Sequence, residues 1–145
     1  MGIRFDRNDL ARALPPQVGW QKLKIVEFKE EVAAQKPGKA RTVNYIFTFE
    51  VTASAVDDKN IGRSITRYYN SSARGFLIPL LAAVWNLTQE KAVEKIASMP
   101  ENEEIDLESL KETEVWNELI EGVYNERPQI QVSDNWSHGE GEPPF

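Results

Sequence analysis

The stretch from Arg41 to Ala55 alternates apolar and polar residues more regularly than any other part of the chain. Tyr45, Phe47 and Phe49 occupy every second position, and mostly polar residues lie between them. A period of two places one set of side chains on each face of a strand, so one face is buried and the other is exposed. The stretch therefore predicts a half-buried β-strand with an aromatic inner face.

A first strand is expected before it, from Val18 to Val32. Leu23 and Ile25 alternate with lysines, and the apolar positions then change parity to Val26 and Phe28. A change of parity within one strand predicts a β-bulge, which also bends the strand. A polar turn at 36–39, where Pro and Gly fit a type II turn, leads into the second strand. Another polar turn, at 57–60, leads into a third strand, which is expected at 61–70.

Helical spacing replaces the strand pattern after residue 71. Ser72 is the expected N-cap of a helix over 73–86, in which Pro79 either kinks the helix or marks its true first turn. Thr88 is expected to cap a second helix over 89–99. We also expect a short helical arm at 5–14. Two late strands are expected at 115–124 and 128–136, although residues 111–122 also fit a helix.

The order of three strands, one or two helices and two strands predicts a mainly β fold. It is the element order of a five-stranded OB-fold barrel, which binds oligonucleotides, with a helical insertion between strands 3 and 4. We expect one domain over residues 1–136 and a flexible acidic tail over residues 137–145, where Gly and Pro are frequent.

Composition argues against several classes of protein. The 145 residues are 41% hydrophobic, enough for a core, and contain no cysteine and a single histidine, His138. The chain therefore lacks the residues for a disulfide framework or a thiolate metal site, and one histidine gives little basis for a histidine-based triad. No apolar run is long enough to cross a membrane, and the N-terminus does not resemble a secretory signal. We expect a cytoplasmic protein that needs no cofactor or metal.

The net charge of −6 conceals a strong polarity. Residues 1–75 contain 13 Lys and Arg against 8 Asp and Glu, whereas residues 76–145 contain 4 against 15. A local basic surface, rather than total charge, determines phosphate binding. The first half of the chain is therefore the expected binding half.

Basic and aromatic residues are interleaved on the first three strands and their turns, as single-stranded nucleic acid requires. Parity favours the core for Tyr45, Phe47 and Phe49, whereas Trp20, Tyr68 and Tyr69 fit stacking and core roles about equally. Single lysines and arginines fit a solvated face, but their concentration favours binding. The candidate nucleic-acid contacts are Trp20, Lys22, Lys24, Lys36, Lys39, Arg41, Tyr45, Arg63, Arg67, Tyr68, Tyr69 and Arg74.

Carboxylate clusters at 57–58, 103–106 and 112–114 are the remaining candidates for chemistry. They lie in a turn and in a polar linker, without a positioning histidine or a phosphate-binding glycine loop. We expect no catalytic residues and no enzyme activity.

The tail carries a possible docking motif, a terminal aromatic beside a free carboxylate; a disordered end or a cloning remnant is the alternative. Over residues 18–136 the chain resembles the OB-fold single-stranded DNA-binding proteins of bacteriophages. Its tail resembles the acidic tip of bacterial single-stranded DNA-binding proteins, which recruits replication and repair enzymes, although it is less acidic. The tail residues concerned are Glu140, Glu142, Pro143, Pro144 and Phe145.

The resemblance implies sequence-independent coating of single-stranded DNA in replication, recombination or repair, by a homo-oligomer in the cytoplasm of a bacterial host. It also implies that the tail competes with DNA for the basic groove and recruits replication or recombination enzymes. Two alternatives stay open. One is a protein-interaction or virion-structural β-barrel without DNA affinity. The other is a small nuclease that uses Asp57 and Asp58, for which the sequence offers least support.

Overall fold

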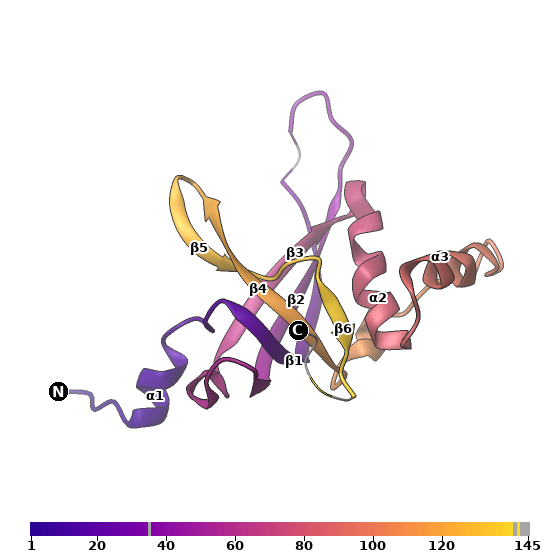
Figure 1. Cartoon of the computed structure of the whole chain (residues 1–145). Coiled ribbons are helices and arrows are strands. Elements are labelled where there is room, and N and C mark those ends of the chain that lie inside the picture. Colours follow the sequence, from indigo (N-terminus) through magenta and orange to yellow (C-terminus); the bar gives the residue numbers. More distant parts are fainter. Residues whose placement is uncertain (35, 141, 143–145) are drawn as a thin grey trace.

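The computed structural model describes residues 1–34, 36–140 and 142, without the side chain of Ala11. This part of the chain forms a mainly β fold, an antiparallel six-stranded sheet with helices at its ends and on one face (Figure 1). The strands are β1 (Gly19–Val32), β2 (Val43–Ser54), β3 (Ser64–Asn70), β4 (Glu114–Tyr124), β5 (Arg127–Gln131) and β6 (Trp136–His138). The helices are α1 (Arg7–Arg12), α2 (Ile78–Trp85) and α3 (Gln89–Ala97), with 3-10 turns η1 (Asp58–Asn60), η2 (Ser71–Leu77) and η3 (Leu107–Leu110).

The strand order in the sheet is β3-β2-β1-β4-β5, and β6 pairs with β4. Strand β1 pairs with the first part of β4, through residues 114–119. On the other edge of β4, β6 pairs with residues 115–117 and β5 pairs with residues 120–124. The last five residues before the β4–β5 turn therefore have a partner strand on one side only.

The bulge expected in β1 is confirmed. Pairing between β1 and β2 shifts register between Ile25 and Glu27, and again between Lys22 and Leu23. After the shift Phe28 joins Leu23 and Ile25 in the core. The turn at 36–39 also has the expected form, because Lys39 N–H donates to the Lys36 carbonyl and Gly38 has a positive φ of 75°.

The core is aromatic, as the alternation in the second strand indicated. Phe47 and Phe49 are fully buried and lie with their ring centroids 6.1 Å apart. Helix α2 buries Leu80 and Leu81 in the same core. Pro79 lies in the first turn of α2, where its missing N–H costs nothing. Thr88 caps α3 as expected, whereas Asn70 rather than Ser72 caps the helical segment after β3.

The strand expected over 128–136 is split into β5 and β6. The side chain of buried Asn117 takes the place of backbone pairing at the break. Its amide nitrogen donates to the carbonyls of Ser133 (3.0 Å) and Asn135 (3.1 Å), and its oxygen accepts from Ser133 N–H. A side chain satisfies these buried backbone groups, so the chain bends there without leaving them unpaired.

The sheet is not closed as a barrel, because no backbone pairing joins β3 to β5 in the described part of the chain. A side chain spans this gap. The Arg67 guanidinium of β3 donates to the carbonyls of Val132 (3.2 Å) and Ser133 (2.9 Å), and it pairs with Asp134 at 2.7 Å. It also lies 4.3 Å from the centre of the Tyr69 ring. We call this gap the β3–β5 seam.

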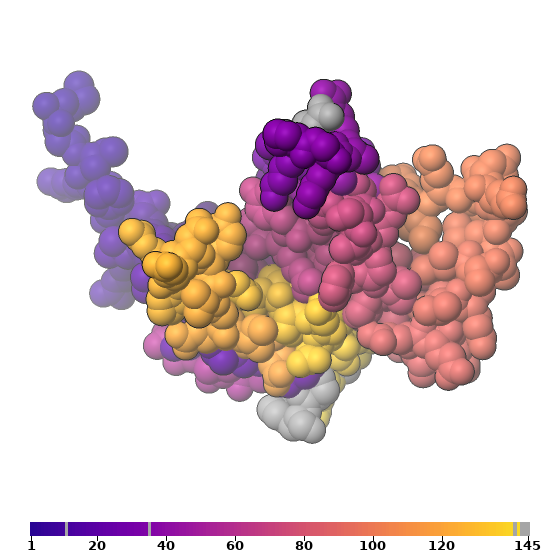
Figure 2. Space-filling model, turned by 90° about the horizontal axis from the view of Figure 1, so that it is seen from above, coloured from indigo at the N-terminus to yellow at the C-terminus, as the bar shows by residue number. Residues whose placement is uncertain are grey.

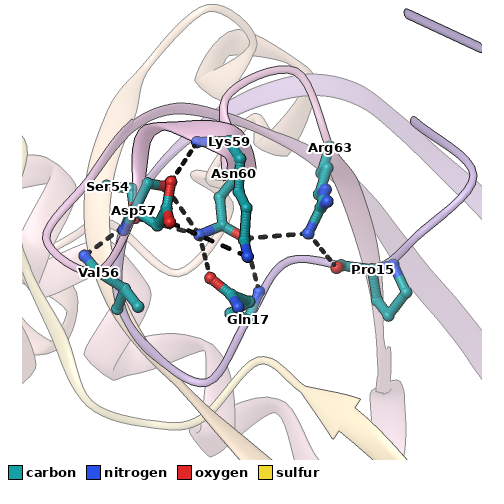
Figure 3. Close-up of polar contacts among 8 residues, drawn as sticks. All are labelled: Pro15, Gln17, Ser54, Val56, Asp57, Lys59, Asn60 and Arg63. Atoms are coloured by element: carbon teal, nitrogen blue, oxygen red, sulfur yellow. Dashed lines mark hydrogen bonds and ion pairs between the residues drawn. The ribbon is translucent and has the colours of Figure 1, made fainter. Parts of the chain in front are cut away.

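A buried polar cluster fixes the segment before β1 (Figure 3). Asn60 accepts from Gln17 N–H at 2.9 Å and donates to the Gln17 side chain at 3.0 Å. Arg63 donates to the Pro15 carbonyl and to Asn60. Residues 15–17 are therefore tied to the β2–β3 connection, and the chain before them leaves the body at this end of the molecule.

The chain stays within the fold beyond residue 136, where the domain was expected to end. Ser137 and His138 belong to β6, and a ring nitrogen of His138 lies 2.8 Å from the Ala83 carbonyl of α2. Gly139 is buried against the backbone of Glu114. In the described chain, no helix combines the length and apolar character needed to cross a membrane.

Candidate nucleic-acid interface

A cleft of about 1130 Å³ follows the outer edge of the β3–β5 seam. One wall comes from β3 and the other from the β4–β5 hairpin, with Pro15 and Asn44 at its margins. The wall residues are Ile65, Thr66, Arg67, Tyr68, Glu121, Tyr124, Pro128, Gln129, Ile130, Gln131 and Val132. Their amides, hydroxyls and phenols give the cleft many hydrogen-bonding groups besides its apolar surface.

The β4–β5 hairpin forms the second wall because its turn is tight. Asn125 and Glu126 have positive φ values of 50° and 64°, as a two-residue type I′ turn requires. This turn matches the twist of the flanking strands, and the hairpin projects from the body (Figure 1). Tyr124 pairs with Arg127 across the turn and therefore lies at the hairpin tip.

Two tyrosines present exposed rings to the cleft from opposite walls. Tyr68 of β3 is 62% exposed and Tyr124 of β4 is 65% exposed. Aromatic rings of this size are usually buried, because burying one contributes about 1.5–3 kcal/mol. Exposed aromatics in a groove are the groups on which unpaired bases stack.

Arg67 places a cation in the lining of the same cleft. Its three acceptors across the β3–β5 seam hold the guanidinium in place, and its side chain keeps 18% of its exposure. Asp134 balances part of its charge, and Glu121 is an anion in the same cleft. The cleft is therefore suited to stacking and hydrogen bonding more than to strong electrostatic attraction.

Three unpaired cations lie on the neighbouring β1–β2 hairpin. Lys36, Lys39 and Arg41 are exposed and have no acidic partner within the part of the chain that the structure describes. The β1–β2 and β4–β5 hairpins both protrude, with residues of β3 and η2 between them (Figure 2). Arg74 of η2 is also exposed.

The expectation that Arg63 and Tyr69 form an exposed binding face on the third strand is wrong. Arg63 is 7% exposed and Tyr69 is 3% exposed. In β3 the parity shared by Arg67 and Tyr69 faces the core, since these residues pair with Phe47 and Tyr45 of β2. Burial also raises the pKa of the Tyr69 phenol far above its ordinary value.

Tyr45 belongs to the same interior. It is half-buried and stacks on Phe28, with ring centroids 6.5 Å apart. This placement agrees with the parity argument, which assigned the row of Tyr45, Phe47 and Phe49 mainly to the core.

The first-strand candidates share one face, as expected, but their charges are already paired. Lys22 lies 3.4 Å from Glu114, and Lys24 lies 2.9 Å from Glu112. The hydrogen bond to Glu112 raises the pKa of Lys24 above its ordinary value. Trp20 is half-buried on the same face. This face is less available to phosphates than its sequence suggests.

The tail candidates are only partly described. Glu140 and Glu142 are exposed, and Glu140 lies 3.8 Å from the His138 ring. Pro143, Pro144 and Phe145 lie outside the described residues.

Sequence reasoning missed Tyr124. Its strand was expected, but its exposure depends on the neighbouring turn at 125–127, which was treated only as a connection. The usable signal was an aromatic residue directly before that short polar turn, because such a position lies at a hairpin tip.

The residues that the structure describes contain no cluster of three His, Asp or Glu side chains that can hold a metal ion. No model of a known protein family matches the chain, and no curated protein is significantly similar to it. The case for function therefore depends on the geometry above.

Proposed function

We propose that this chain is a non-enzymatic single-stranded DNA-binding protein, acting in the replication, recombination or repair of phage DNA. The observation that carries the proposal is the pair of exposed rings, Tyr68 and Tyr124, on facing walls of one cleft. Stacking on aromatic rings is tolerant of sequence, because every base has a π-face.

The fold proposed for this activity is an open form of the OB-fold. Support comes from the strand order β3-β2-β1-β4-β5 and from the helices inserted between β3 and β4. In this proposal Arg67 holds the β3–β5 seam where a barrel has a backbone ladder. OB-folds bind oligonucleotides on the face of strands 2 and 3 and between the loops after strands 1 and 4. In this proposal the cleft and the two protruding hairpins take those roles.

In the proposed complex the bases stack on Tyr68 and Tyr124, while phosphates contact the exposed cations of the β1–β2 hairpin. A net charge of −6 does not prevent this, because the cations are concentrated locally. The resemblance of the tail adds a second role, the recruitment of replication or recombination enzymes through residues 140–145.

The direct test is the fluorescence anisotropy of a labelled oligo(dT), titrated with the full chain at several salt concentrations. We expect binding that weakens as salt rises, and much weaker binding to duplex DNA of the same length. If oligo(dT) does not bind at low salt, the proposal is wrong. The exposed surfaces would then serve protein contacts, as in the alternative of an interaction or virion-structural protein.

The salt dependence of DNA binding distinguishes the basic residues that have acidic partners from those that do not. Replacing Lys36, Lys39 and Arg41 with alanine should lower the slope of log K against log salt by about 2, since each lost phosphate contact removes about 0.7 for single strands. Anisotropy titrations from low to moderate salt measure this slope.

The control for that experiment is the double variant Lys22→Ala/Lys24→Ala, which removes lysines held by Glu114 and Glu112. Its slope should match that of the unmodified protein. If both variants change the slope equally, phosphates are not bound preferentially at the β1–β2 hairpin.

A further inference from the structure

The first fourteen residues form an arm with an unusual surface. Its large apolar side chains are exposed, namely Met1, Ile3, Phe5, Leu10 and Leu14. Exposed apolar side chains gathered in one short segment favour an interaction site, whereas single ones need no explanation. The arm also carries Arg4, Arg7 and Arg12, which have no acidic partner among the described residues.

Local hydrogen bonds order the arm in the absence of a partner. Asp6 and Asp9 form a capping box at the start of α1, so these two carboxylates are occupied by backbone N–H groups. Before α1 the chain is not helical, and the side chains of Ile3 and Phe5 are two residues apart. The cluster around Asn60 and Arg63 fixes the base of the arm at residues 15–17 (Figure 3).

A groove of complementary character lies on the side of α2 and the segment that follows α3. It has a volume of about 790 Å³ and is lined by apolar side chains that include Leu77, Ile78, Leu81, Ile96 and Met99. Its rim carries Glu30, Glu101, Glu103 and Glu104 against one cation, Arg74. None of these four carboxylates has a basic partner in the described part of the chain.

We infer that the arm of one copy of this chain docks into the acid-rimmed groove of a second copy. Apolar arm residues such as Ile3 and Phe5 would fill the apolar floor, and unpaired arginines such as Arg4 would meet the unpaired glutamates of the rim. Charge complementarity and the unpartnered apolar surface on both sides identify the occupant as this arm.

The positions of the two surfaces favour docking between copies. The arm and α3 lie at opposite ends of the molecule in both views (Figures 1 and 2). Contact between the arm of one copy and the groove of another can build a ring or an open filament, and it closes into a two-fold dimer when two copies exchange arms. This assembly does not depend on DNA binding.

Two variants that each disable one surface test the inference by sedimentation velocity, in buffer without DNA and over a range of protein concentrations. The arm variant is Ile3→Asp/Phe5→Asp, and the groove variant is Glu103→Lys/Glu104→Lys. The unmodified chain should form concentration-dependent species larger than the monomer. Each variant alone should self-associate at least tenfold more weakly.

Mixing the two variants provides the decisive measurement. Each retains the surface that the other lacks, so an equimolar mixture should form a one-to-one dimer and stop there. Adding Arg4→Glu/Arg7→Glu to the groove variant should restore self-association by exchanging the charges. Circular dichroism melting of each variant confirms that loss of assembly is not loss of fold.

Three results would overturn the inference. The first is an unmodified chain that stays monomeric at all concentrations. That result is expected if the arm docks into the groove of its own copy or onto another protein. The second is a mixture that does not form the dimer although both variants are folded. The third is a pair of variants that assemble as well as the unmodified chain. All three readouts are independent of oligo(dT) binding, so they do not test the proposed DNA-binding function.

Discussion

Replacing Tyr68 and Tyr124 together with alanine should weaken the binding of oligo(dT) by about 30-fold or more. The reason is that stacking of one base on an aromatic side chain contributes about 1–3 kcal/mol, and 1.4 kcal/mol is a tenfold change in affinity. Both side chains are more than 60% exposed, at 62% and 65%, so their removal leaves no cavity in the core. Anisotropy titrations at one fixed salt concentration measure the change.

Two controls identify stacking as the cause. The variant Tyr68→Phe/Tyr124→Phe keeps both π-faces and should bind almost as tightly as the unmodified chain. Phe76 is an aromatic residue of η2 that is 55% exposed and does not line the cleft. Phe76→Ala should therefore have little effect. If Phe76→Ala weakens binding as much as the double tyrosine variant, the cleft is not the DNA site.

Replacing Arg67 with methionine should lower the free energy of unfolding by about 2–4 kcal/mol. The methionine keeps a long side chain against Tyr69 but cannot donate to the carbonyls of Val132 and Ser133. Both of these residues are buried. The Val132 carbonyl is left without a donor, which costs about 1–3 kcal/mol, whereas the Ser133 carbonyl keeps the Asn117 amide and loses one hydrogen bond, which contributes about 1 kcal/mol. Urea unfolding followed by tryptophan fluorescence measures the loss.

Asp134→Asn is the matched control, since it removes only the charged partner of Arg67. Asp134 is half exposed, and ion pairs near the surface contribute about 1 kcal/mol or less. A loss for Arg67→Met no larger than for Asp134→Asn would show that the seam does not depend on the two carbonyl contacts.

Local patterns in the sequence were sufficient for most of the fold. The alternation around Phe47 and the parity change after Ile25 gave the aromatic core strand and the bulge correctly. The caps and helix starts at Thr88 and Pro79 also depend only on neighbouring residues. Each of these features is determined within a few residues, where sequence spacing carries the physical information.

Features that depend on distant partners were predicted less well. The break between β5 and β6 depends on Asn117, which is 16 residues from Ser133. The parity of β3 suggested an exposed face because it carries two arginines. Arg63 and Arg67 are tolerated inside because carbonyls 48 to 66 residues away accept from them. No local pattern shows such acceptors.

The candidate site shows the same division. Tyr68 was identified from its charged neighbours, and its exposure agrees with that role. Tyr69, one residue later, was assigned the same role but lies in the core, since adjacent strand residues point to opposite faces. Tyr124 joins the cleft only because the β4–β5 hairpin lies across from β3, a tertiary arrangement.

The β3–β5 seam has a consequence for local unfolding. The first part of strand β1, residues 19–24, has backbone partners on both sides, in β2 and β4. Its amide hydrogens should therefore exchange with solvent only when the whole domain unfolds. Within the described residues strand β5 has a backbone partner only in β4, and Arg67 links β3 to the segment that directly follows β5. Its amides should exchange through smaller openings of lower free energy. Native-state hydrogen exchange should therefore show that the β4–β5 hairpin opens as a unit. In this opening the hairpin separates from β3 while the rest of the sheet stays folded.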